Sequence, residues 1–117
     1  MAITRPFHLQ RWIAEHRHLL QPPVGNKQIY VQNDDFIVMV VGGPNGRKDY
    51  HWEEGEELFY QLEGEITVYI QEDGQKKAMT LSAGDMYLHP ANVPHSPVRS
   101  AGSIGLVIER KIGRAHV

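Results

Sequence analysis

The pattern of apolar and polar positions divides the chain into one helical segment and a series of short strands. In residues 7–20 the apolar side chains recur close to the spacing of one helix face. We therefore predict an amphipathic helix over residues 7–20. Pro22 and Pro23 are predicted to end it, because proline lacks the backbone N–H and clashes with the preceding turn.

From residue 28 to residue 111 the pattern changes to short apolar or alternating runs, separated by Gly, Pro, Asn and Asp. The runs are KQIYVQ, FIVMVV, ELFYQL, EITVYIQE, KKAMTL, DMYLH, HSPVR and IGLVIERK. Strands about 8–12 residues apart, with one helix, predict an all-β sandwich or barrel. Glu63-Gly64 and Asp73-Gly74 are each predicted to form a hairpin turn.

Composition limits the classes of function. The chain has 117 residues, which is enough for a single domain with one hydrophobic core. Its net charge is −2 without a basic run, which disfavours nucleic acid and anionic membranes as partners. No apolar stretch reaches the ~20 residues of a membrane span, and the N-terminus lacks the apolar core of a signal peptide. We therefore expect a cytoplasmic protein.

The acidic segment of residues 46–64, GRKDYHWEEGEELFYQLEG, is either a solvated loop or a metal site at a strand end. Alternation along the strand places Glu57 on the same face as Phe59 and Gln61. An unpaired glutamate inside a barrel would cost several kcal/mol. A divalent cation shared with His51 would remove that cost. The chain contains no cysteine, so any metal must be held by His, Asp or Glu.

A second histidine that could complete such a site lies in the segment GDMYLHPANVPHSPVR, residues 84–99. We predict a strand, a turn and the start of a further strand here. The segment resembles the second motif of the cupin superfamily, which Gly84, Pro90 and His95 match. Asn92 stands where the motif has a turn glycine, and asparagine tolerates the left-handed backbone region.

The first cupin motif is matched at His51, Glu57 and Gly64, while Glu53 stands where a second histidine is usual. Two histidines and one glutamate therefore remain, namely His51, Glu57 and His95. This is the composition of the facial triad that leaves positions open on non-haem Fe(II). We interpret the neighbouring glutamates 53, 54 and 56 as a solvated acidic face.

Several blocks in the right order resemble one family more closely, that of 3-hydroxyanthranilate 3,4-dioxygenase. They are PPVGNKQ, VVGGPNGRKDYH, EELFYQLEG, LHPANVPHSPVR and LVIER, within residues 7–110. The resemblance implies a cupin-type double-stranded β-helix, or jelly-roll barrel. It implies that Fe(II), one per chain, is bound by His51, Glu57 and His95. With O2, the enzyme would open the ring of 3-hydroxyanthranilate to 2-amino-3-carboxymuconate semialdehyde, in tryptophan degradation and NAD biosynthesis.

The same resemblance implies the substrate-binding residues. Arg47 and Arg99 would hold the substrate carboxylate, for which a planar guanidinium is well suited. Glu109 would contact the substrate hydroxyl and transfer its proton. Alternation predicts that Arg99 shares a strand face with His95, and that Glu109 and Arg110 point to opposite sides.

The chain also departs from this family. Bacterial members usually continue into a segment with two Cys-x-x-Cys pairs, and the absence of cysteine excludes that second iron. The segment 113–117 does not resemble the family's continuation, which leaves a cloning scar, a shifted reading frame or a natural end. We expect a homodimer, because the strand IGLVIERK would otherwise expose an apolar edge.

Three functions are compatible with the sequence: the ring-opening dioxygenase, another metal-dependent cupin enzyme, and a truncated cupin that binds metal or ligand without turnover. The two arginines favour the first. The absence of the family's usual C-terminal continuation favours the third. The orientation and role of His89 stay open, and Trp12 is interpreted as a core or interface residue.

Overall fold

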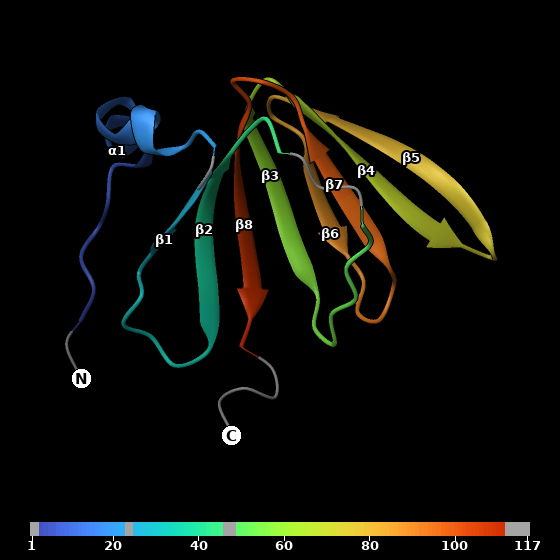
Figure 1. The fold of residues 1–117 in the computed structure, drawn as a ribbon. Helices are drawn as coiled ribbons and strands as arrows, with labels where there is room; N and C mark the ends of the chain where they lie inside the picture. The colour runs from blue at the N-terminus through green and yellow to red at the C-terminus, as the bar shows by residue number, and fades with distance from the viewer. Residues whose placement is uncertain (1–2, 23–24, 46–48, 112–117) are drawn as a thin grey trace.

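The computed structural model describes residues 3–22, 25–45 and 49–111 (Figure 1). Arg47 and the segment 113–117 lie outside the described residues. One helix, α1 (Leu9–His16), is followed by the 3-10 helix η1 (Arg17–Leu19). The strands are β1 (Asn26–Ile29), β2 (Phe36–Gly42), β3 (Glu57–Glu63), β4 (Glu65–Glu72), β5 (Gln75–Ser82), β6 (Met86–His89), β7 (His95–Arg99) and β8 (Ile104–Arg110). The predicted all-β fold with a short N-terminal helix is confirmed.

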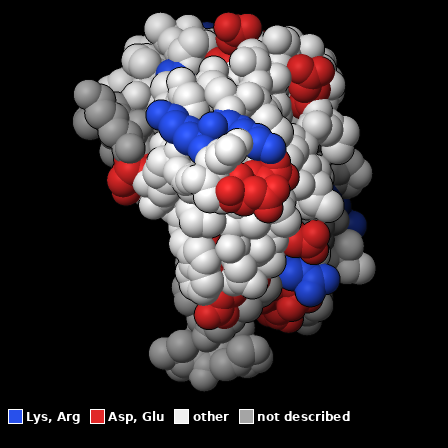
Figure 2. All heavy atoms as spheres, turned by 90° about the vertical axis from the view of Figure 1, so that its right-hand side faces the viewer, with Lys and Arg blue, Asp and Glu red and all other residues white. Residues whose placement is uncertain are grey.

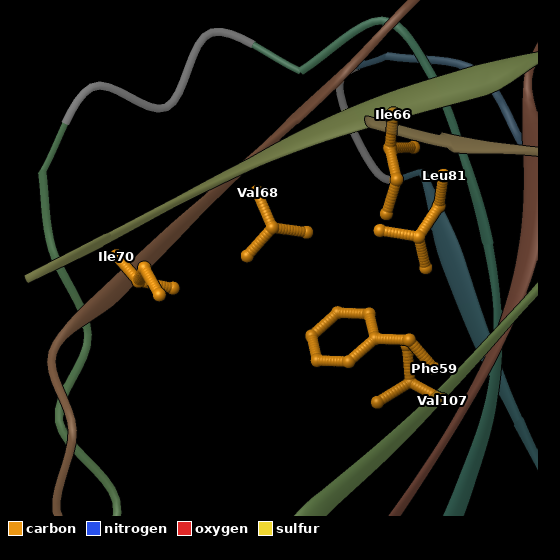
Figure 3. Packing of buried hydrophobic residues seen from close by; sticks show 6 residues of the cluster. All are labelled: Phe59, Ile66, Val68, Ile70, Leu81 and Val107. Carbon is orange, nitrogen blue, oxygen red and sulfur yellow. The ribbon is translucent and has the colours of Figure 1, made fainter. Parts of the chain in front are cut away.

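The strands form two antiparallel sheets that face each other. The five-stranded sheet has the order β1-β2-β8-β3-β6, and the three-stranded sheet has the order β5-β4-β7. Apolar side chains from both sheets meet between them and form the main core (Figure 3). These buried side chains are Phe59, Ile66, Val68, Ile70, Leu81 and Val107. Burial of this apolar surface holds the two sheets together.

A second core joins α1 to the outer face of the five-stranded sheet. Met39 and Val41 pack toward the main core, so the intervening Val40 points to the other face, where Ile13 and Leu20 cover it. The helix ends at His16, well before the prolines that were predicted to end it. Instead the chain tightens into η1, which directs Leu20 into this second core.

The Asp73-Gly74 turn is a hairpin turn, as predicted. It joins β4 to β5 in direct register, with Glu72 opposite Gln75. Both turn residues have positive φ, 53° and 73°, which is the backbone of a type I′ turn that matches the strand twist.

The hairpin predicted at Glu63-Gly64 is wrong. The strands on either side belong to different sheets, because β3 pairs with β6 and β8 while β4 pairs with β5 and β7. Gly64 has φ 67°, and a Cβ there would lie 3.1 Å from Ser103 Cα. The glycine is therefore needed where the chain crosses tightly from one sheet to the other.

The predicted apolar edge at the last strand is also wrong. β8 lies inside the five-stranded sheet, paired with β2 on one side and β3 on the other. The argument for a homodimer from this edge therefore fails, and the homodimer stays a prediction.

The surface charge and the length of the helices are relevant to nucleic acid and membranes, the partners that the composition disfavoured. Figure 2 shows one short band of basic side chains with acidic side chains directly beside it, and further charged groups of both signs on the same face. Among the described residues, no helix is long and apolar enough to cross a membrane. The cytoplasmic location stays a prediction.

Candidate metal and substrate site

A cavity of about 420 Å³ opens between the two sheets. Its walls come from β1, β2, β3, β7, β8 and the segments before β1 and β3. All of the candidate residues that the structure describes line it, namely His51, Glu57, His95, Arg99 and Glu109. The fold thus gathers into one cavity side chains that are far apart in the sequence.

The first residues of β3 and β7 meet in the wall of the cavity. Glu57 Oε1 lies 3.0 Å from His95 Nε2, and both side chains are buried. The two atoms are at ion-pair distance, but Glu57 Oε1 lacks the geometry of a hydrogen bond. Two ligands about 2.1 Å from one ion and at right angles would be about 3.0 Å apart. The observed separation therefore fits two ligands that share a cation.

Burial by itself would raise the pKa of Glu57. The contact with His95, a hydrogen bond with Glu109 and the nearby His89 outweigh this effect, so the pKa of Glu57 is lowered. The carboxyl group is thereby kept in the charged form that binds a cation.

Backbone pairing brings the second histidine to the same place. His51 and His95 form an isolated antiparallel bridge, in which each backbone N–H donates to the other residue's carbonyl, with N···O distances of 2.6 and 2.9 Å. Their ring centroids are 5.4 Å apart. Two imidazoles and a carboxylate are suitable donors for a divalent transition metal. Among the described residues, however, no three His, Asp or Glu side chains stand as a complete metal-binding group. The three side chains are of types that bind a metal. Two of them, Glu57 and His95, already lie at the separation expected for two ligands of one ion.

His89 forms the wall behind His95, a role that the sequence left open. It is buried, and its ring centroid lies 4.2 Å from that of His95. The carbonyl of Val93 can only accept, so His89 Nε2 donates to it, at 2.7 Å, and Nδ1 accepts from the Tyr87 hydroxyl, at 2.8 Å. Burial lowers the pKa of His89, although the bond to Val93 opposes this. His89 is therefore a neutral ring that packs against His95.

Arg99 brings a buried positive charge to the same cavity. It is 6% exposed and lies on the face of β7 that His95 shares, as alternation predicted. Burial lowers its pKa to about 10, against the influence of the Glu57 charge. Among the described residues, no carboxylate pairs with Arg99, and its guanidinium makes no hydrogen bond. A buried cation that no described carboxylate pairs, facing a cavity, is suited to an anionic ligand.

Glu109 lies beside Glu57 and also faces the cavity. The two residues are direct partners across β3 and β8. Arg110 is exposed, so the predicted alternation at this strand end is confirmed. A carboxyl group is thus placed next to the candidate metal ligands without being one of them.

The interpretation of Glu53 as part of a solvated face is wrong. Exposure alternates along residues 51–57, so that His51, Glu53 and Glu57 line the cavity while Glu54 and Glu56 are exposed as predicted. Glu53 is half-buried and lines the cavity. The alternation that identified Glu57 extends back to this residue and could have indicated it.

Sequence reasoning missed Asn45, which also lines the cavity. Its side-chain amide donates to Pro97 O at 2.9 Å, and its carbonyl oxygen accepts from Arg99 N at 2.8 Å. No periodicity marks this residue, because it acts from a loop onto a strand that follows much later in the chain.

Two facing antiparallel sheets with candidate metal ligands on the inner strand ends define a cupin. Solved structures support this fold. A Neisseria meningitidis protein matches with a TM-score of 0.69 and 20% identity, over 92% of this chain and 100% of that protein. A Bacillus subtilis oxalate decarboxylase matches with a TM-score of 0.59 and 20% identity, over 72% of this chain and 24% of the enzyme. At this level of identity, the likeness shows the fold alone.

Sequence comparison identifies the family. Residues 1–116 match the model of the 3-hydroxyanthranilic acid dioxygenase family, and the chain belongs to it. The 3-hydroxyanthranilate 3,4-dioxygenase of Xanthomonas campestris is 58% identical over 109 residues, which is 93% of this chain and 61% of that enzyme. The enzyme of the same name from Paraburkholderia phytofirmans is 54% identical over 92% of this chain and 62% of its own length. The chain thus spans about three fifths of these relatives.

Proposed function

We propose that this chain is a ring-opening dioxygenase that converts 3-hydroxyanthranilate and O2 to 2-amino-3-carboxymuconate semialdehyde. One observation carries the proposal. The buried Arg99 guanidinium, which no described carboxylate pairs, shares a cavity with the Glu57–His95 pair. A substrate that bears a carboxylate beside metal-chelating groups would use both features. The names of the relatives support this choice of substrate.

The metal is proposed to be Fe(II), held by His51, Glu57 and His95. When bound, ferrous iron would bring the aminophenol and O2 together and make their reaction fast. The two imidazoles and one carboxylate would leave positions free for both reactants. His89 would support His95 from behind through ring packing.

The remaining cavity residues would bind and orient the substrate. Arg99 would hold the carboxylate, and Arg47, which lies outside the described residues, is proposed to assist it. Glu109, beside Glu57, would accept the proton of the substrate hydroxyl. Phe59 and Val107 supply apolar wall that would pack against the ring and exclude water. Both atoms of O2 enter the product, so no further reductant is needed.

Two other functions predict different results. Another metal-dependent cupin enzyme would bind a metal but leave 3-hydroxyanthranilate intact. A non-catalytic cupin would bind metal or ligand without turnover. Family membership favours the dioxygenase, and a turnover assay separates the three. The homodimer is part of this proposal, and light scattering at micromolar concentration tests it, with a monomer as the contrary result.

The test is anaerobic reconstitution with Fe(II), followed by 3-hydroxyanthranilate in air and detection of the ring-opened product by absorbance. We expect product from the wild type. Arg99→Ala should weaken substrate binding by about 2–5 kcal/mol, because a buried charge pair is lost, while iron binding is retained. Arg17→Ala is the matched control, since Arg17 is paired with Glu63 on the surface. A wild type that binds iron without forming product would support the non-catalytic cupin instead.

A further inference from the structure

Among the described residues, the strand that carries Arg99 is paired with a neighbouring strand on one side only. β7 pairs with β4 along its length, and on the other side a backbone partner is present at its first residue, through the His51–His95 bridge. His95 directs its N–H and C=O to this edge, and alternation along β7 directs the Pro97 carbonyl and the Arg99 N–H to the same edge, where they need partners. Both are buried or half-buried.

The carboxamide of Asn45 satisfies both groups at once. Its Nδ2 donates to Pro97 O at 2.9 Å, and its Oδ1 accepts from Arg99 N at 2.8 Å. One donor and one acceptor, offered side by side, reproduce the pairing of a peptide group in a neighbouring strand. The side chain of Asn45 thus continues, at Pro97 and Arg99, the edge pairing that the backbone of His51 makes at His95.

The chain beside Asn45 also lies tightly against Arg99. A Cβ on Gly43 would meet Ser100 O and would lie 3.0 Å from Arg99 Cβ. The Arg99 backbone is therefore fixed by Asn45 on one side and by β4 on the other. A long side chain can place its guanidinium reproducibly only if its own backbone is fixed in this way.

We infer that Asn45 is a positioning residue, which holds Arg99 so that the cavity prefers aminophenols that carry a carboxylate. This inference rests on the proposed function, because Arg99 is there given the substrate carboxylate. Asn45 acts on the substrate through Arg99. Its removal should therefore cost carboxylate recognition and leave the metal ligands in place.

The test compares 3-hydroxyanthranilate with 2-aminophenol, which lacks the carboxylate. For Asn45→Ala we expect kcat/KM to fall about tenfold or more with 3-hydroxyanthranilate, since a buried N–H loses its partner. With 2-aminophenol the change should be less than about twofold, since Arg99 has no carboxylate to bind. Asn45→Asp keeps the acceptor for Arg99 but loses the donor to Pro97, and it should show the same selective loss. This nearly isosteric variant covers the case in which Asn45→Ala does not fold.

Two controls separate positioning from general structure. Asn33→Ala removes another carboxamide that bonds the backbone, at Tyr30 and Phe36, and Asn33 does not line the cavity. It should lower stability without changing the ratio of kcat/KM for the two substrates. In an Arg99→Ala background, Asn45→Ala should have no further effect on that ratio. An equal loss with both substrates, or a further change of the ratio without Arg99, would overturn the inference.

A binding measurement distinguishes failure of this inference from failure of the proposed function. Calorimetry on the Zn(II)-loaded protein compares the affinities of the two compounds without turnover. A wild type that makes no product but binds 3-hydroxyanthranilate more tightly, with the preference lost in Asn45→Ala, supports the inference and contradicts the dioxygenase. Equal affinity of the wild type for both compounds overturns the inference.

Discussion

Glu57 and His95 approach to 3.0 Å although they begin strands of different sheets. Glu57 begins β3 in the five-stranded sheet, and His95 begins β7 in the three-stranded sheet. The contact therefore joins the two sheets at the wall of the cavity. A cation bound between them would link the two sheets, so metal binding and stability should be coupled.

Replacing Glu57 tests the metal site. Glu57→Ala should reduce iron to well below one per chain after desalting, because the only carboxylate proposed to bind the metal is removed. Iron is measured by a colorimetric chelator against protein concentration. Glu54→Ala is the control, since Glu54 is an exposed glutamate three residues before Glu57. Retention of one iron per chain in Glu57→Ala would remove Glu57 from the set of ligands.

Glu109 is expected to affect turnover and not metal binding. Glu109→Gln should lower kcat by about 10²–10⁴-fold, the usual contribution of a positioned general base, with iron retained. Steady-state kinetics and iron content are measured together. The neighbouring Arg110→Ala should behave like the wild type, because Arg110 points to solvent. A normal kcat in Glu109→Gln would make Glu109 a wall residue.

Because Gly105 has no side chain, the guanidinium of Arg99 can lie against it. A Cβ on Gly105 would be 2.9 Å from Gln61 Oε1 and 3.0 Å from Arg99 Nη1. Gly105→Ala should therefore cost about 1–3 kcal/mol of stability through overpacking and raise the KM for 3-hydroxyanthranilate. Urea unfolding and kinetics measure the two effects, with iron content unchanged. An unaltered KM would mean that Arg99 can shift without loss of its contact to the substrate.

The pair of Arg17 and Glu63, which fastens η1 to the end of β3, should make stability depend on pH. Two hydrogen bonds, of 2.8 and 2.9 Å, hold the pKa of Glu63 below its usual value. The stabilisation is therefore present above the unfolded-state pKa of a glutamate, about 4.3, and is lost as the pH falls through the lowered value. Both side chains are nearly half exposed, so its size is about 0.5 kcal/mol or less.

Glu63→Gln measures this contribution. The free energy of unfolding of wild type minus Glu63→Gln should be positive at pH 7 and approach zero near pH 3. Added salt should reduce it at pH 7. A difference that persists unchanged at pH 3 would show that the charge of Glu63 is not its cause.

Two turns with similar sequences show that local sequence predicts a turn but not which strands pair across it. Glu63-Gly64 and Asp73-Gly74 carry the same signal, a charged residue followed by a glycine in the left-handed region. Only the second joins paired strands, because Gly64 lies against Ser103 at a corner between sheets. A tight turn fixes the backbone of two residues, while the strands that pair are selected by burial on both sides.

The sequence by itself determined the strand positions, the inward face of Glu57, the shared face of His95 and Arg99, and the family resemblance. These depend on a period of two and on local motifs, which the order of residues contains. The tertiary structure decided that β8 is central, that His89 packs behind His95 and that Asn45 pairs with the edge of β7. Those features join residues far apart in the chain, and the physical reason is that burial between two sheets, and not local propensity, selects which distant groups meet.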